Sequence, residues 1–433
     1  MTLQAEPTTA ATVHAERHTV GGLATYVWRP DGPPRAVLVA RTPYDAAGHA
    51  PEGVGWARHG VALVLQDVRG RHGSPGRFTP YAGEGPDGAD LLAWTRRRPW
   101  VRGPVVLHGT SYGAHCALAA LAALEEHGAA PADGPDAVSL AVPALGLGET
   151  AWTRGGAFQL ASRLGWWGEH ADLADWERVV DATRDDADRA ALAARQRVPL
   201  LAIGGLHDHF AHDTVDLARA WGGPAWLVLG PWGHDLRGAR RAERVLAWLD
   251  RLADGAPPTG AVVGDGTRSL RPGTPLRRRL AVALGGGILR VDPAHPVPSP
   301  PFGTRELDPR VRPDRLLLPV DLPCPGAGRA LVADVAAYVA GDAPPGTPPD
   351  AVWCVALARR VPGPGGPVLE ELAHGAAVGP RVTLGPVVLD PADDHVLVVA
   401  ADAFPRTAPA RSGSAHVRTV RHVDLEVAPW PLR

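Results

Sequence analysis

The residues most able to do chemistry in this chain lie in a Gly-x-Ser-x-Gly motif at positions 109–113. A short apolar run at 105–108 precedes the motif, and a helix rich in small residues is expected after it at 114–124. This order is typical of a nucleophile elbow, in which a sharp turn between strand and helix exposes a serine hydroxyl. Glycines suit such a strained turn because it leaves no room for a Cβ on either side. The motif therefore predicts Ser111 as a nucleophile.

A nucleophilic serine needs a base, and the base needs an orienting acid, in the chain order Ser, acid, His for this type of turn. Asp208 follows an apolar run at 199–204, and His234 follows another at 225–230. Because parallel strands end at one edge of a sheet, both side chains are expected beside the serine. We assign Ser111, Asp208 and His234 as the catalytic triad.

Each of these two partners also has a simpler interpretation. Asp208 is a possible cap for a helix that begins near Asp213, and His234 is a possible loop histidine without a role. Asp235 and Asp213 are lesser competitors for the place of the acid. The placement of both residues in the right order, each after its own strand, favours the triad.

A metal site is an alternative use of the same segment, because imidazoles and carboxylates are good ligands for zinc or iron. The residues are nearly contiguous, so few of them are expected to converge on one ion. We therefore predict no metal and no cofactor. The possible ligands in this segment are His207, Asp208, His209, His212 and Asp213.

The elements that must position these residues form an α/β pattern with one interruption. Short apolar runs alternate with helical stretches over 1–145 and again over 198–253, which predicts a buried parallel sheet. Residues 146–197 are helical and rich in tryptophan, and such an insertion is expected to lie over the carboxyl edge of the sheet as a cap. From 254 to 433, short strands between Pro and Gly punctuation predict a jelly-roll β-sandwich.

Composition excludes several classes of protein. With 433 residues, 45% of them hydrophobic, the chain is long enough for two or three domains. A net charge of −2 with interspersed acids and arginines argues against a nucleic-acid partner. No run approaches a membrane span and the N-terminus lacks a signal peptide's apolar core, so we expect no membrane association and a cytoplasmic protein. The three cysteines, Cys116, Cys324 and Cys354, show no pairing or metal spacing.

Motifs spread over most of the chain resemble those of the CocE/NonD hydrolases, a family that includes cocaine esterase, α-amino-acid ester hydrolases and X-Pro dipeptidyl peptidases. These motifs include the elbow and the stretches after the two later strands, at 204–210 and 230–234. The others are Arg41-Thr42-Pro43-Tyr44-Asp45, Gln66-Asp67-Val68-Arg69-Gly70-Arg71 with Ser74, Gly76 and Phe78, Arg98-Pro99-Trp100, Asp292-Pro293 with Pro296-Val297-Pro298, and Phe404-Pro405-Arg406.

The resemblance implies an α/β-hydrolase core, a helical cap and a C-terminal jelly roll. It also implies an oxyanion hole, made by the phenol of Tyr44 and the backbone N–H of Tyr112. Two donors fixed where negative charge develops lower the reaction barrier by several kcal/mol. Aromatic residues that match the family's acyl pocket are Trp152, Trp166, Phe210 and Phe404. Core packing is the alternative role for these four.

The sequence also departs from the family pattern. The cap is shorter than usual, and Leu206-His207 stands where an aromatic pair is common, so the acyl pocket is expected to differ. Members that bind an amino group use carboxylates near the site, and the cap offers Glu149, Glu169 and Asp172 for this. Asp67 and Arg69 are expected to fix a loop through an internal ion pair.

These observations predict a serine hydrolase that cleaves carboxylic esters, or amides, through an acyl-enzyme. The expected partner is a small-molecule ester or amide. Two alternatives stay open: an aminopeptidase or acyltransferase that uses the same triad, and a non-catalytic binding protein on a hydrolase scaffold. The sequence says nothing about the oligomeric state.

Overall fold

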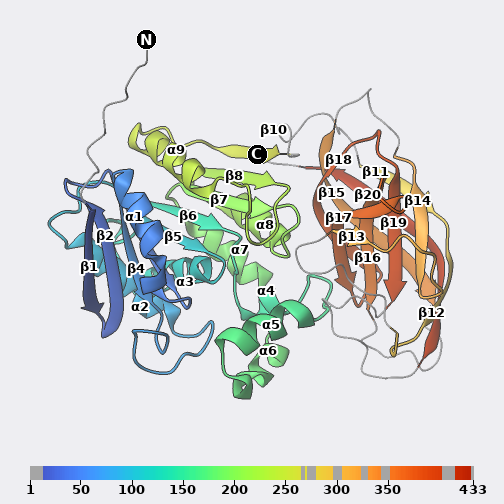
Figure 1. Ribbon diagram of the computed structural model, residues 1–433, viewed down its shortest axis with the longest axis horizontal. Coiled ribbons are helices and arrows are strands. Elements are labelled where there is room, and N and C mark those ends of the chain that lie inside the picture. The colour runs from blue at the N-terminus through green and yellow to red at the C-terminus, as the bar shows by residue number, and fades with distance from the viewer. Residues whose placement is uncertain are drawn as a thin grey trace, which may run out of the picture.

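The computed structural model describes most of the chain, and all statements below concern that part. It combines an α/β sheet, a small helical cap and two antiparallel sheets that pack together (Figure 1). The described residues are 13–264, 269–270, 279–295, 305–322, 330–342, 352–401 and 415–430.

Ten strands form the first sheet, in the order β1-β2-β4-β3-β5-β6-β7-β8-β9-β10. All neighbouring pairs from β4 through β3 to β9 are parallel, whereas β1, β2 and β10 pair antiparallel at the two edges. The central strands are buried along their length, as expected for a sheet with helices on both faces. The strands are β1 Val13–Val20, β2 Leu23–Pro30, β3 Ala36–Thr42, β4 Val61–Asp67, β5 Val105–Thr110, β6 Ala137–Ala141, β7 Leu200–Gly205, β8 Ala225–Gly230, β9 Gly260–Gly264 and β10 Ser269–Leu270.

Helices cover both faces of this sheet, and alternate residues of one strand show which helices share a face. Val37 and Val39 of β3 pack in one core with α2 Glu84–Arg96, α3 Tyr112–Glu126, α7 Asp186–Arg195 and α8 Ala211–Ala220. Ala36 and Leu38 of the same strand pack in the opposite core with α1 Ala50–Arg58 and α9 Arg241–Ala253. This period of two is the signature of a strand buried on both sides. Two short 3₁₀ turns, η1 Ala46–His49 and η2 Pro131–Asp133, complete the layer.

The cap is the chain segment between β6 and α7, and Figure 1 shows its helices in green at the lower centre. Its small apolar core brings together Ala151, Trp167 and Val179. Its elements are α4 Leu147–Ala151, α5 Leu160–His170, η3 Leu173–Asp175 and α6 Glu177–Asp181.

Two five-stranded antiparallel sheets enclose a second large apolar core. One sheet contains β11 Leu280–Leu284, β12 Gly287–Val291, β15 Leu331–Asp342, β18 Arg381–Leu389 and β20 His416–Pro429. The other contains β13 Glu306–Leu307, β14 Arg315–Val320, β16 Trp353–Val361, β17 Val368–Ala377 and β19 His395–Ala401. The predicted fold class, an α/β-hydrolase core with a helical cap and a C-terminal β-sandwich, is confirmed.

Two features of the first sheet were not apparent in the sequence. Strand β1 consists mostly of polar, partly exposed residues, because it is an edge strand with only one buried face. Strands β9 and β10 belong to this sheet although they follow residue 254, where the β domain was predicted to begin. The sheet therefore extends beyond the predicted boundary of the core.

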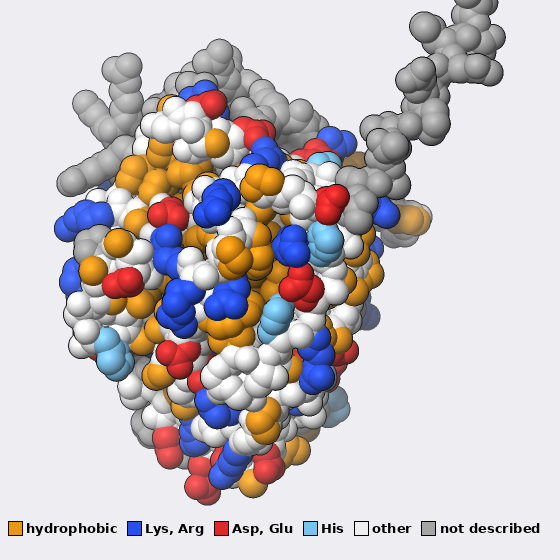
Figure 2. All heavy atoms as spheres, turned by 90° about the vertical axis from the view of Figure 1, so that its left-hand side faces the viewer, with side chains coloured by type: hydrophobic (Ala, Val, Ile, Leu, Met, Phe, Trp, Pro, Cys, Tyr) orange, Lys and Arg blue, Asp and Glu red, His pale blue; other side chains and the backbone are white. Residues whose placement is uncertain are grey.

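One face of the α/β part shows side chains of both charges. On the face turned toward the viewer in Figure 2, arginine and acidic side chains alternate with apolar ones. Among the described residues, none of the helices has the length and apolar character needed to cross a bilayer.

Trp430, which follows β20, fixes the β-sandwich to the α/β part. Its side chain is 2% exposed and belongs to the same core cluster as the sheet and α8. The guanidinium of Arg219 lies 5.4 Å from the centre of the Trp430 ring and 2.9 Å from a carboxylate oxygen of Asp334 on β15. Trp430 therefore contributes both apolar packing and a cation–π contact to this interface.

We predict that Trp430→Ala lowers the free energy of unfolding by about 3–5 kcal/mol, because it removes a fully buried aromatic side chain. Urea denaturation followed by circular dichroism measures the loss. Val417→Ala, a truncation at a half-exposed position of β20, serves as the control and should change stability by less than about 0.5 kcal/mol. Equal denaturation midpoints for the two variants would contradict this account of the interface.

Candidate active site

The backbone at Ser111 is strained in the way that a nucleophile elbow requires. Its φ is 54° and its ψ is −117°, a conformation that L-residues rarely adopt. The N–H of Ser111 donates to the carbonyl of Ala141 at 2.9 Å, which anchors the turn to β6. A Cβ at Gly109 would lie 2.2 Å from the carbonyl oxygen of Gly113, and one at Gly113 would lie 3.0 Å from that of Arg41. A side chain at Gly109 would therefore clash with the backbone, and one at Gly113 would be tightly packed against it.

The three residues predicted as a triad lie in one hydrogen-bonded chain. The Nε2 of His234 is 2.9 Å from the Oγ of Ser111, and its Nδ1 is 2.9 Å from Oδ1 of Asp208. They follow β5, β7 and β8, whose carboxyl ends share one edge of the sheet. With the proton on Nδ1, His234 donates to Asp208 and can accept the serine proton at Nε2.

The Asp208 carboxylate is kept ionised by its neighbours. Burial alone would raise its pKa, but the charges of His209 and His234 and the hydrogen bond to His234 outweigh that effect, so its pKa lies below its usual value. The Nδ1 of His209 is 3.2 Å from the same carboxylate oxygen that binds His234. Asp208 can therefore orient the base as an anion.

Tyr44 and Tyr112 are the two residues expected to supply the oxyanion donors. The Tyr44 hydroxyl accepts a hydrogen bond from Nε1 of Trp166 at 2.8 Å, which leaves its own proton available to another acceptor. Burial raises the pKa of Tyr44 to about 12, so the phenol stays protonated. Tyr112 is the first residue of α3, and an N–H at this position has no acceptor within the helix.

A buried polar network behind the elbow fixes the side chain of Tyr112. Its hydroxyl donates to Glu84 at 2.7 Å and accepts from the N–H of Tyr81 at 2.9 Å. The other carboxylate oxygen of Glu84 accepts from Arg41 at 2.7 Å. Burial raises the pKa of Glu84, although the charge of Arg41 opposes the rise. The network holds α3 at a fixed distance from β3, and with it the N–H of Tyr112.

The aromatic residues predicted for the acyl pocket do not all lie together. The Trp166 ring stacks on Tyr112, the residue after the serine, at 5.5 Å. The Phe210 ring lies edge-on to His234 of the triad at 5.3 Å. Trp152 instead packs on Phe158 at 4.9 Å, inside the cap. Phe404 lies outside the described residues. Trp166 and Phe210 are therefore the pocket candidates that the structure supports by position.

Two histidines of the segment after β7 contact the β-sandwich, and an aspartate of the same segment contacts arginines of residues 146–197. The Nε2 of His207 accepts a hydrogen bond from Arg305 at 2.7 Å, and the ring of His212 is hydrogen-bonded to the backbone of Leu384. Asp213 accepts hydrogen bonds from Arg154 at 3.2 Å and Arg184 at 2.9 Å. These contacts explain the clustering of histidines without a metal ion.

Only two of the five possible metal ligands in this segment come together. Asp208 and His209 have ligand-type atoms within 4.8 Å of each other and of His234, the third member of that group. Two of these three residues already form the hydrogen bond between acid and base described above. The other possible ligands considered for the disfavoured metal site, His207, His212 and Asp213, do not belong to this group.

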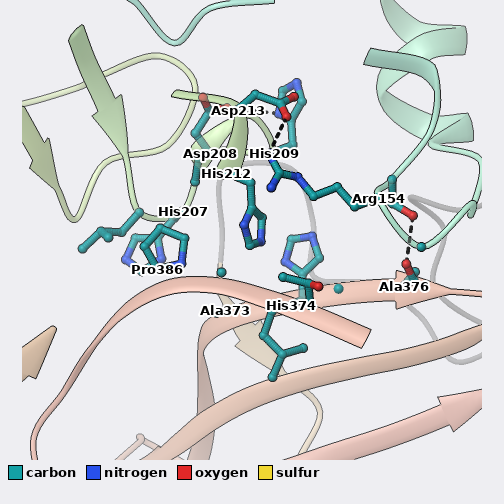
Figure 3. Close-up of a pocket in the computed structure, with 18 of the residues that line it drawn as sticks. Arg154, His207, Asp208, His209, His212, Asp213, Ala373, His374, Ala376 and Pro386 are labelled. Carbon is teal, nitrogen blue, oxygen red and sulfur yellow. Dashed lines mark hydrogen bonds and ion pairs between the residues drawn. The ribbon is translucent and has the colours of Figure 1, made fainter. Parts of the chain in front are cut away.

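A cavity of about 100 Å³ lies beside the acid loop, between the α/β part, the cap and the β-sandwich. Figure 3 shows the imidazoles of His207, His212 and His374 along it and the ion pair between Arg154 and Asp213. Ser111 does not line this cavity. It is therefore distinct from the space in front of the serine.

The loop after β4 is fixed differently from what was expected. Arg69 pairs with Asp87 of α2 at 2.7 Å and not with Asp67. Asp67 accepts hydrogen bonds from the backbone N–H of Ala46 at 2.7 Å and of Gly73 at 3.1 Å. The predicted internal ion pair was wrong, because the motif is closed by a carboxylate accepting backbone hydrogen bonds.

Two of the three cap carboxylates considered for an amine site, Glu149 and Asp172, are engaged in hydrogen bonds within the cap. Glu149 is buried, accepts from the N–H of Asp185 at 2.7 Å and faces Arg189. Asp172 caps η3 by accepting from Ala174, and the side chain of Glu169 is 75% exposed. Their hydrogen bonds are structural.

Sequence reasoning missed two residues that touch the site. His170 lies 5.0 Å from the Tyr44 ring, and His209 contacts Asp208. His170 is four residues after Trp166, so helical spacing from that predicted pocket residue would have indicated it. His209 follows the acid directly, but nothing in the sequence says to which side its ring turns.

Fold and site together define a chain with the α/β-hydrolase fold and a Ser-His-Asp arrangement at the carboxyl edge of its sheet. Residues 22–197 match the sequence model of the X-Pro dipeptidyl-peptidase (S15) family. Cocaine esterase from Rhodococcus sp. (strain MB1 Bresler) is 26% identical over 284 residues, which cover 51% of this chain. The match spans 48% of cocaine esterase, about half its length.

Solved structures of similar fold cover almost the whole chain. An α-amino acid ester hydrolase has a TM-score of 0.71 at 17% identity, with 99% of this chain and 98% of that chain covered. A CocE/NonD family hydrolase from Staphylococcus aureus has a TM-score of 0.66 at 11% identity, with 96% and 93% covered. The resemblance to the CocE/NonD and S15 hydrolases is confirmed.

We predict that Tyr44→Phe lowers kcat for an ester by about 10²–10³-fold, the usual loss of one oxyanion donor. KM should change little, because the hydroxyl acts mainly on the charged transition state. Steady-state kinetics measure both values. Tyr26→Phe, a change at another half-buried tyrosine remote from the elbow, is the control. A Tyr44→Phe variant with unchanged kcat would remove this residue from the oxyanion hole.

We predict that the folded state loses stability as the pH falls from about 6.5 toward 4. Burial lowers the pKa of His212 to about 3 and that of His207 to about 4, from an ordinary value near 6.5. Below that value the unfolded chain binds more protons than the folded chain, so the free energy of unfolding decreases. Urea titrations over this pH range measure it.

His212→Gln removes one titrating group and should make this decrease shallower. His295→Gln, at a side chain that is 82% exposed, should leave it unchanged. A wild-type stability independent of pH in this range would contradict the assignment of buried neutral imidazoles.

Proposed function

We propose that this protein is a serine hydrolase that cleaves carboxylic esters through an acyl-enzyme intermediate. The observation that carries the proposal is the continuous chain of hydrogen bonds from Ser111 through His234 to Asp208. Nucleophile, base and orienting acid are each within reach of the next, which is the geometric requirement for nucleophilic catalysis.

In the first half of the reaction, Ser111 attacks the ester carbonyl while His234 takes the serine proton at Nε2. The tetrahedral oxyanion accepts hydrogen bonds from the Tyr44 hydroxyl and the N–H of Tyr112. His234 then gives its proton to the leaving alcohol as the ester C–O bond breaks, which leaves the acyl group on Ser111.

In the second half, a water molecule takes the place of the alcohol. His234 removes a proton from the water as it attacks the acyl carbonyl, and the same two donors bind the second oxyanion. Collapse of this intermediate breaks the bond to Ser111 and returns the proton to its Oγ. Asp208 stays ionised throughout and holds the imidazole in the required tautomer.

Relatives with names that specify ester substrates support hydrolysis of esters. The names cocaine esterase and α-amino acid ester hydrolase both describe ester cleavage. A peptidase acting on X-Pro amides is the second candidate, supported by the match of residues 22–197 to the S15 family model. The engagement of Glu149 and Asp172 favours the ester, because neither carboxylate is free to bind a peptide's amino group.

We predict that Ser111→Ala abolishes ester hydrolysis and labelling by a fluorophosphonate probe, while the circular dichroism spectrum is unchanged. The wild-type protein should be labelled at Ser111, as mass spectrometry of its peptides would show. Ser162→Ala, at a partly exposed serine of the cap, is the control and should keep both activities. Parent-rate hydrolysis by Ser111→Ala would contradict the proposal.

A further inference from the structure

One face of α5 is turned toward the candidate active site. Arg163, Trp166 and His170 recur at the spacing of one helical stripe. Trp166 donates to Tyr44, and His170 lies against the Tyr44 ring. Arg163 is the third member of this stripe and the one with a full charge, so its environment bears on the substrate.

Arg163 is buried, with only 4% of its surface exposed. Its Nη1 donates to the hydroxyl of Tyr81 at 3.3 Å, and its Nε is enclosed without a hydrogen-bond partner. Within the described part of the chain, no carboxylate lies within 4.0 Å of its guanidinium. A buried guanidinium without a counterion costs several kcal/mol of desolvation.

Arginines on either side of the candidate site are paired with carboxylates. Arg41, 3% exposed, is 2.7 Å from a carboxylate oxygen of Glu84. Arg154 and Arg184 share Asp213 beside the cavity of Figure 3. Because buried charges are normally paired, the missing partner at Arg163 indicates a site for an external anion.

The guanidinium of Arg163 lies near two aromatic residues of the candidate site. Its Cζ is 6.0 Å from the ring centre of Trp166 and 6.0 Å from that of Phe210. Trp166 contacts both oxyanion tyrosines, and Phe210 contacts His234. Cation–π attraction to two rings is worth about 1–4 kcal/mol in total, which compensates the burial only in part. An anion bound to Arg163 would therefore lie beside the aromatic residues that contact Tyr44 and His234.

We infer that the substrate's acyl group carries a carboxylate, as in the half-esters of short dicarboxylic acids, and that Arg163 binds it. This inference rests on the proposed function and specifies its substrate class. The carboxylate takes no part in bond making: the ester C–O bond breaks, the alcohol leaves with the proton from His234, and water releases the dicarboxylate. The ion pair holds the acyl carbonyl against Ser111 and the two oxyanion donors.

A buried positive charge at Arg163 also disfavours substrates that carry an amino group. A substrate with a free ammonium near its acyl carbon would meet the positive charge of Arg163, which lies in the low-dielectric interior beneath the cap. Burial raises the pKa of Tyr44, and the charge of Arg163 opposes this rise, so the cation acts across the site. The site thus selects anionic over cationic acyl groups.

The test compares two 4-nitrophenyl esters that differ in the end of the acyl chain: the half-ester of glutaric acid and the pentanoate. For the wild-type protein, kcat/KM should favour the half-ester by at least about tenfold, the value of one charge-assisted contact. Arg163→Gln should abolish most of this ratio, and Arg163→Lys should restore part of it. Ser111→Ala supplies the background of spontaneous hydrolysis.

Arg178→Gln is the matched control. Arg178 also belongs to the cap and donates to the carbonyl of Pro80, next to the residue that Arg163 contacts. The structure places neither Trp166 nor Phe210 against it, so the ratio should stay at the wild-type value. A merely structural Arg163 would lower both rates by one factor and leave the ratio unchanged, which would overturn the inference.

A binding measurement separates this inference from the proposed function. Calorimetry measures the affinity of glutaric acid monoamide for two inactive proteins, the Ser111→Ala variant and the Ser111→Ala/Arg163→Gln double variant. The double variant should bind at least about tenfold more weakly. Equal hydrolysis of the two esters by the wild-type protein would overturn only the assignment of Arg163. If the wild-type protein neither hydrolyses the esters nor reacts with the fluorophosphonate, the hydrolase proposal is overturned. A loss of monoamide binding with Arg163→Gln would still support the anion site.

Discussion

The strained backbone of Ser111 is the constraint on which the site depends. A positive φ at a serine has a conformational cost, and the surrounding structure must supply the stabilisation that maintains it. Here the hydrogen bond to Ala141 ties the turn to β6, and close contact between the strand and α3 excludes side chains at Gly109. The direction of the serine hydroxyl and the start of α3 are thus set by the same few backbone contacts.

The same contacts explain why the oxyanion donors are fixed. Once α3 begins directly after Ser111, the N–H of Tyr112 lies beside the serine oxygen. The tyrosine's side chain then reaches Glu84 and Arg41, a buried ion pair that connects α2, α3 and β3. Removing one partner of such a buried pair leaves an uncompensated charge, which is more costly than the pair is favourable. The network therefore favours one arrangement of these three elements.

Much of this architecture could be predicted because its determinants are local. The apolar runs that became β5, β7 and β8 predicted where Ser111, Asp208 and His234 would lie, since parallel strands end at one edge. The partner of Arg69 was mispredicted, because Asp87 lies on a helix 18 residues away and spacing alone does not bring the two together. The sequence does not distinguish Trp152 from Trp166. Only the packing of the cap shows that Trp152 lies in its core and that Trp166 faces Tyr44. Whether a carboxylate lies near Arg163 likewise depends on contacts between segments that are distant in the sequence.

The hydrogen bond from Trp166 to Tyr44 gives the cap a part in the chemistry itself. An insertion of this kind is usually regarded as a lid that selects substrates, and its exchange between relatives as a route to new specificity. In this chain, Tyr44, which we propose as a donor to the developing negative charge, is oriented by a side chain of the lid. Evolution of the insertion is therefore restricted: a new cap that admits another substrate must also provide an indole N–H, or an equivalent, over Tyr44. The same helix, α5, therefore affects both substrate recognition and the rate of the chemical step. This favours gradual substitution along α5 over replacement of the whole cap.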